Sequence, residues 1–187
     1  MRPTARALLL TAAAMFAPAV GPALAADPLP AGADRVTVRA PRPEAFNDFK
    51  ATCIGMDERT RGLLTDFTHF IRATGARHVP EGGALAITLI DVDMAGEFET
   101  WRGPQACSVR VMFDIYAPRI RLDFRLTDRD GKVLRAGPRE LRDPLYLTRA
   151  ARLSTDPLRY EKNLVQDWFQ REFSGPAGGA QRPGATK

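Results

Sequence analysis

The strongest candidates for a functional site in this chain are four acids within a stretch of nine residues. They are Asp91, Asp93, Glu97 and Glu99. An Asp-x-Asp pair followed by Gly96 at the sixth position imitates the start of an EF-hand loop, and calcium prefers such oxygen ligands. The imitation then fails, because Ala95 holds the fifth position and Arg102 stands where a bidentate glutamate is needed. The pattern favours acids that cap backbone groups or pair with basic residues at a strand end, and we expect no metal site.

The loop that follows these acids could bind a ligand or a partner. It contains Phe98, Trp101 and Arg102 and ends in Gly103-Pro104. Tryptophan and arginine are enriched at binding hot spots, and a planar guanidinium suits an anionic or sugar-bearing ligand. Alternatively, Phe98 and Trp101 fold back and cover the edge of a sheet. If the chain has a binding site, we expect it to consist of this loop and the four acids.

A stripe of arginines is a second candidate for ligand binding. Arg119, Arg121 and Arg125 share one face of a predicted strand, with Asp123 between them. Such a stripe could hold the phosphate groups of an anionic envelope polymer. An antiparallel strand with one solvated face produces the same pattern without any ligand, so the role of the stripe stays open.

The residues needed for common enzyme mechanisms are scarce. The chain has three serines and two histidines, without a nucleophile elbow or a His-Glu-x-x-His motif, and we assign no catalytic residue and no cofactor. We therefore expect a non-catalytic interaction or ligand-binding module. The alternative is a carboxylate-based hydrolase or calcium-dependent enzyme that uses the four acids.

The N-terminus predicts export. Arg2 and Arg6 precede an apolar run over 7–20, and Ala23-Leu24-Ala25 provides a cleavage site. The run is too short to span a bilayer. We expect a signal peptide over 1–25, a periplasmic or secreted protein, and no transmembrane segment after cleavage.

Cysteine content indicates a disulfide, and net charge limits the classes of binding partner. Cys53 and Cys107 are the only cysteines, and in an oxidising compartment an even pair predicts one disulfide. The net charge of +5 is too small to indicate nucleic acid, so an envelope protein or an anionic envelope component is the expected partner. Acids outnumber bases over 26–109 and bases outnumber acids over 110–159, which favours attraction between the two halves within one fold.

Hydrophobic periodicity predicts an α+β domain over 35–173, between a disordered leader over 26–34 and a disordered tail over 174–187. A helix is indicated over 63–74, with Asp57 as its cap and Gly75 at its end, and a final helix starts at Pro157. Alternating residues predict strands; they lie over 36–38, 85–94, 109–115, 120–126 and 132–141. We expect a mainly antiparallel sheet of four to five strands with both helices packed on one face.

Two details of this pattern concern the sheet itself. The apolar parity switches from Leu85, Ile87 and Leu89 to Ile90 and the alternate residues that follow, which predicts either a bulge or a strand that leaves the cover of one layer. The sequence Asp-Arg-Asp-Gly over 128–131 predicts a tight turn between the last two strands.

Several separated motifs carry a family resemblance. They are the sequences DVDMAGEFETWRGP over 91–104, DIY over 114–116 with PRI over 118–120, DPLRYEK over 156–162, and Trp168-Phe169. Together they resemble the bacterial domain-of-unknown-function family three-zero-one-six, over about Val36 to Phe173. The resemblance implies an exported proteobacterial protein. It implies no activity, cofactor or catalytic residue.

The export signal leads to a first prediction. Ala26 should be the first residue of the exported protein, because the charged, apolar and small-residue regions occur in the order that a signal peptidase recognises. N-terminal sequencing of protein from an osmotic-shock fraction measures this. Recovery of chains that still begin with Met1 from the cytosol would contradict it.

Overall fold

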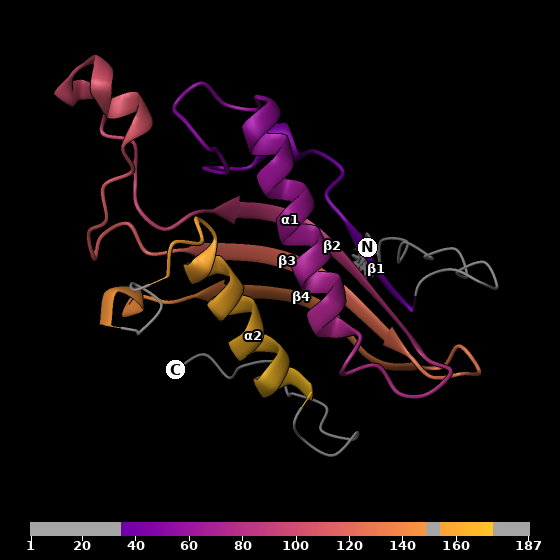
Figure 1. Ribbon diagram of the computed structural model, residues 1–187. Coiled ribbons are helices and arrows are strands. Elements are labelled where there is room, and N and C mark those ends of the chain that lie inside the picture. Colours follow the sequence, from indigo (N-terminus) through magenta and orange to yellow (C-terminus); the bar gives the residue numbers. More distant parts are fainter. Residues whose placement is uncertain (1–34, 149–153, 174–187) are drawn as a thin grey trace, which may run out of the picture. The chain divides into compact units, whose positions relative to one another are not determined.

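A computed structural model describes residues 35–148 and 154–173 of the chain (Figure 1). The predicted signal peptide over 1–25, the leader over 26–34 and the tail over 174–187 lie outside the described residues.

Four strands form one mixed sheet, in the order in which they occur along the chain. They are β1 (Val36–Arg39), β2 (Ala84–Asp93), β3 (Arg119–Thr127) and β4 (Val133–Arg142). β1 runs parallel to β2, because helix α1 (Glu58–Gly75) connects them, and the other neighbours are antiparallel. Helix α2 (Arg159–Phe173) follows β4, and both helices lie on the same face of the sheet (Figure 1). The predicted α+β class with a mainly antiparallel sheet is confirmed.

The core lies between the helices and one face of the sheet. Alternate residues of β2 and β3 point into it, and Trp168 and Phe169 of α2 pack against them. The indole of Trp168 meets the ring of Phe124 edge to face, with 5.4 Å between the ring centroids. The opposite face of the sheet has no helix over it in the described part of the chain, and we call it the open face.

Helix α1 begins and ends at the residues that the sequence indicated. The carboxylate of Asp57 accepts the backbone N–H of Thr60 at 2.8 Å, and this hydrogen bond is the main reason why the pKa of Asp57 is lowered. At Gly75, a Cβ would lie 3.1 Å from the ring of Phe169, so the two helices approach closely there. Gly62 has no such reason, since a Cβ at that position would meet nothing within 4 Å. A glycine inside a helix costs about 1 kcal/mol relative to alanine, so Gly62 lowers stability without a packing benefit.

The predicted bulge in β2 is confirmed. The register between β2 and β3 shifts between Leu89 and Asp91, and Ile90 is left 49 % exposed. Beyond the shift, Val92 keeps the core face, whereas Asp91 and Asp93 turn to the open face. The bulge therefore decides where the acids of this strand lie.

The predicted strand over 109–115 is wrong. Only Val111 pairs with another segment, through an isolated bridge to Glu97, and Val109, Phe113 and Ile115 are exposed. The physical reason is that the chain between β2 and β3 pairs with itself, Gly96 N–H donating to the carbonyl of Tyr116, and so leaves the sheet. An alternating pattern indicates an extended segment but does not guarantee a neighbouring strand.

The predicted start of the final helix is also displaced. Pro157 lies in a turn, in which the Asp156 carboxylate accepts the backbone N–H of Leu158 at 2.8 Å, and α2 begins at Arg159. The Asx turn occupies the donors that the first helical turn would otherwise leave free.

The predicted disulfide is confirmed. Cys53 and Cys107 are bonded, with 4.8 Å between their α carbons. The bond joins the loop before α1 to a short 3-10 helix, η3 (Pro104–Ser108), and Cys53 N–H also donates to the carbonyl of Cys107. No helix in the described part of the chain is long and apolar enough to cross a membrane.

A buried carboxylate fixes the turn that follows β2. Glu161 of α2 is fully buried, and its Oε1 accepts the backbone N–H of Ala95 at 2.7 Å. Its Oε2 has no hydrogen-bond partner among the described residues. Burial raises the pKa of Glu161 to about 7, although Ala95 N–H and the guanidinium groups of Arg110 and Arg159 oppose the rise.

This carboxylate predicts a pH-dependent stability. Between the ordinary pKa of 4.5 and the folded value of about 7, the folded state holds a proton that the unfolded state loses. Stability therefore falls as the pH rises through this window, by up to about 3 kcal/mol. Glu161→Gln should remove most of that fall, measured by chemical denaturation at pH 5 and pH 8.

The control is Glu81→Gln, which removes an exposed carboxylate. It should leave the wild-type pH dependence in place. Equal pH slopes for wild type and Glu161→Gln would contradict the assignment.

Candidate functional site

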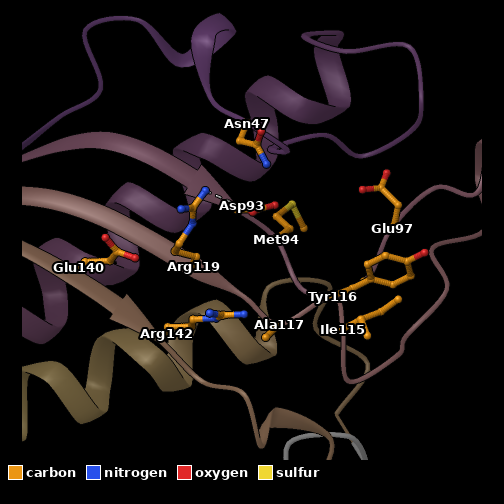
Figure 2. Close-up of a pocket in the computed structure, with 11 residues that line it drawn as sticks. Asn47, Asp93, Met94, Glu97, Ile115, Tyr116, Ala117, Arg119, Glu140 and Arg142 are labelled. Carbon is orange, nitrogen blue, oxygen red and sulfur yellow. Dashed lines mark ion pairs between the residues drawn. The ribbon is translucent and has the colours of Figure 1, made fainter.

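A polar pocket of about 270 Å³ opens on the open face of the sheet, where β2 ends and β3 begins (Figure 2). Its walls include hydrophobic residues, but most of the side chains that face it are polar. The polar lining residues are Asn47, Asp93, Glu97, Tyr116, Arg119, Glu140 and Arg142.

Strand register brings the charged residues together. Asp93, the last residue of β2, is the partner of Arg119, the first residue of β3. Arg119 is in turn the partner of Arg142, the last residue of β4. Glu140 lies two residues before Arg142 and so shares its face of the strand. Three strand ends thus deliver four charged side chains to one place (Figure 2).

A segment outside the named strands completes the wall beside Asp93. Asp48 pairs with Asp93 through a parallel bridge, and its carbonyl accepts the N–H of Met94 at 2.9 Å. Asp48 is buried and neutralised by Arg110 at 2.6 Å and Lys50 at 3.1 Å. The neighbouring Asn47 therefore reaches the pocket on a backbone that two hydrogen bonds, to Val92 and from Met94, hold in place.

Asp93 is electrostatically strained at this position. Burial raises its pKa, and the nearby carboxylates of Asp48 and Asp91 raise it further, whereas a hydrogen bond from Asn47 and the charge of Arg119 lower it. The ion pair between Arg119 and Asp93 measures 3.8 Å, the same as that between Arg119 and Asp91, so one guanidinium serves two acids. Acids with such raised pKa values are typical of functional sites.

Two charged residues of the pocket have no partner in the part of the chain that the structure describes. Neither Glu140 nor Arg142 forms an ion pair or a side-chain hydrogen bond there. Glu97 uses Oε1 to accept the N–H of Phe98 at 3.0 Å. The pocket therefore presents a guanidinium and two carboxylates that can still bind a ligand, beside the partly neutralised Asp93 and Arg119.

The four acids of the candidate cluster do not gather in one site. Asp93 and Glu97 line the pocket, but Asp91 is buried and accepts the N–H of Asn47 at 2.7 Å and a bond from Arg121 at 3.2 Å. Glu99 is also buried, forms an ion pair with Arg102, and accepts the Tyr116 hydroxyl at 3.2 Å. Among the described residues, no group of three His, Cys, Asp or Glu side chains is placed to hold a metal ion. Two of the four acids thus line the pocket, and the other two are paired elsewhere in the fold.

The two aromatic residues of the loop have separate environments. Phe98 is buried, and the Arg110 guanidinium lies 4.4 Å from the centre of its ring. Trp101, on the 3-10 helix η2 (Thr100–Arg102), is 70 % exposed. Neither residue lines the pocket, and neither does Arg102.

The arginine stripe is partly used within the fold. Arg119, Arg121 and Arg125 lie on the open face as the alternation predicts, and the first two pair with Asp91. Acids from the front half of the sequence therefore attract arginines from the back half, as the charge distribution suggested.

Sequence reasoning missed several residues of the pocket, among them Asn47, Tyr116, Glu140 and Arg142. A signal for Arg142 exists, because the turn over 128–131 makes the last two strands antiparallel and sets Arg142 opposite Arg119. Asn47 and Tyr116 come from irregular segments, for which the sequence offers no comparable register.

The sheet, the two helices and the disulfide define a disulfide-bonded α+β domain with a charged pocket at its strand ends. Over residues 34–171 the chain matches the model of the family described as protein of unknown function (DUF3016), and it belongs to that family. The resemblance noted from the motifs is thereby confirmed. No curated protein and no solved structure matches the chain.

The loop aromatics lead to a paired prediction on stability. Phe98→Ala should cost about 3–5 kcal/mol, because it removes a large buried side chain and the face over which Arg110 lies. Trp101→Ala should leave the melting temperature nearly unchanged, because its side chain is mostly in solvent. Thermal and urea denaturation of both variants measure the difference, and a large loss for Trp101→Ala would show that it covers the core.

Proposed function

We propose that the protein is an extracytoplasmic, non-catalytic binding module whose pocket holds a small zwitterionic ligand, such as a free amino acid or a short peptide. The observation that carries the proposal is the pair of unpartnered charges of opposite sign, Arg142 and Glu140, in one pocket of about 270 Å³. A pocket of this size suits a small molecule.

Arg142 supports an anion subsite. It lies directly across from Arg119, and like charges opposite each other on neighbouring strands repel. Arg119 is neutralised by Asp91 and Asp93, but Arg142 has no carboxylate within the described residues. A carboxylate of the ligand would relieve this repulsion and match the planar guanidinium in two hydrogen bonds.

The carboxylates of the pocket support a cation subsite. Glu97 and Glu140 retain free oxygens, and Asp93 has its pKa raised mainly by burial. An ammonium group placed among them would stabilise their charged forms. The pocket carries three acids and two arginines, so a ligand with both charges fits it better than a simple anion or cation.

The disulfide supports the proposed compartment. A structural disulfide persists in oxidising surroundings, and the bond between Cys53 and Cys107 supports an extracytoplasmic location. Together with the N-terminal signal predicted from the sequence, it favours the periplasm or the exterior of the cell. Free amino acids and short peptides are zwitterions of the size required.

Direct binding measurements test the proposal. A panel of free amino acids and dipeptides is screened by thermal shift and then by calorimetry, and the tightest binder is retested with its amino group acetylated or its carboxylate amidated. Each blocked form should bind about tenfold or more weakly, because one charge-assisted hydrogen bond is lost. Arg142→Gln should weaken the unblocked ligand to a similar extent and remove the penalty of amidation.

The matched control is Arg125→Gln. Arg125 lies on the same open face and also has no partner in the described residues, but it does not line the pocket. Its variant should bind like wild type. No binding by any member of the panel, or equal losses for Arg125→Gln and Arg142→Gln, would overturn the proposal.

A second candidate function is docking of an envelope protein through Trp101. The favouring observation is that this large aromatic side chain is 70 % exposed on a disulfide-anchored segment. Trp101→Ala should then abolish crosslinking to that partner in intact envelopes while the zwitterion affinity stays unchanged.

A further inference from the structure

A groove separate from the zwitterion pocket runs beside the first half of α1. Its volume is about 620 Å³. One wall is a single face of α1, formed by Arg59, Gly62, Leu63 and Asp66, whose spacing of three and four residues places them together. The loop before α1, the chain between β2 and β3 and the turn before α2 supply the other lining residues. We propose that this groove binds a single-chain anionic amphiphile, namely a free fatty acid.

The walls suit an acyl chain. Leu63, Met94, Phe98 and Met112 contribute apolar surface, and the exposed wall is more apolar than polar. Methionine side chains adapt to flexible apolar ligands because they are unbranched and polarizable. The disulfide joins two segments that line the groove, since Cys53 is two residues from Ala51 and Cys107 adjoins Ser108.

The charges at the groove suit an anionic head group. Lys50, Arg59, Arg110 and Arg159 line it, against the single acid Asp66. The buried Asp48 already neutralises Lys50 and Arg110. Arg59 and Arg159 form no ion pair within the described residues, but the Arg159 guanidinium donates to the carbonyl of Asp156 and lies 4.6 Å from the centre of the Tyr160 ring. Arg59 is therefore the lining cation best placed to meet a carboxylate, and Arg159 adds positive charge beside it.

Gly62 is the residue that indicates use of the groove. It weakens α1, it adopts ordinary helical backbone, and no neighbouring atom requires the absence of a side chain there. Its absent side chain does widen the groove between Arg59 and Leu63. A glycine in a helix interior has a reason when a ligand approaches the backbone closely.

Displacement of a dansyl-labelled undecanoic acid tests the inference with the purified protein. Dodecanoate should compete up to about fivefold better than dodecanol, which lacks the charge, and dodecyltrimethylammonium should not compete. Lengthening the acid from octanoate should tighten binding about fourfold per methylene until the groove is filled. Equal competition by the acid, the alcohol and the ammonium compound would overturn the proposal and leave a non-specific apolar surface.

Two matched pairs of variants locate the site without unfolding the protein. Gly62→Leu should fill the groove and weaken dodecanoate at least tenfold, whereas Gly62→Ala should weaken it far less, and both should raise the melting temperature. Arg59→Gln should weaken dodecanoate up to about fivefold, whereas Arg61→Gln, exposed on the same helix but outside the groove, should not. Unchanged affinity in Gly62→Leu would overturn the inference.

The inference does not depend on the proposed zwitterion function. Arg142→Gln changes only the pocket on the open face, and dodecanoate binding should be the same in that variant. A loss of dodecanoate binding in Arg142→Gln would overturn the assignment to the groove.

Discussion

The register shift in β2 is the constraint on which the rest of the structure depends. Without an extra residue at Ile90, the alternation of a strand would send Val92 to the open face and turn Asp91 and Asp93 into the core. Two carboxylates in an apolar core would cost far more than the ladder hydrogen bond that a bulge disrupts. The shift keeps Val92 against Ile120 and sets the acids opposite Arg121 and Arg119. The bulge near the end of β2 reverses which residues face the core, and it thereby places Asp93 in the pocket.

The turn immediately after β2 contributes to both the polar pocket and the groove beside α1. The carboxylate of Glu161, on α2, accepts the N–H of Ala95. The carbonyl of Asp48, in the segment before α1, accepts the N–H of Met94. Met94 lines both the polar pocket and the apolar groove, so this short turn is their common wall. Burying the charged form of this carboxylate costs free energy, and its pKa is raised for the same reason.

The sequence predicted those features that local chemistry decides. The Asp57 cap, the tight turn at Gly131 with φ 77°, the bulge and the disulfide each follow from residue type and spacing. The expected strand over 109–115 does not form, because an alternating pattern does not specify which strand it pairs with. In this segment Val111 pairs with Glu97 instead. Of the candidate site, Asp93 and Glu97 reach a pocket, but their new neighbours Arg142 and Asn47 are far apart in sequence. Cross-strand register and loop packing, which only the fold supplies, bring them together.

The distribution of charge is the reason for proposing binding rather than carboxylate catalysis at this pocket. Acid–base hydrolysis needs two carboxyl groups with different pKa values facing one substrate. Nearby cations oppose this, because they keep both groups ionised. Here arginines neutralise Asp91 and Glu99, and Arg119 stands beside Asp93. Among the described residues the groups that remain free are Glu140, Arg142 and one oxygen of Glu97, so both signs of charge are present. Fixed charges of opposite sign select a ligand by its own charge pattern, and that selection requires no bond to be made or broken.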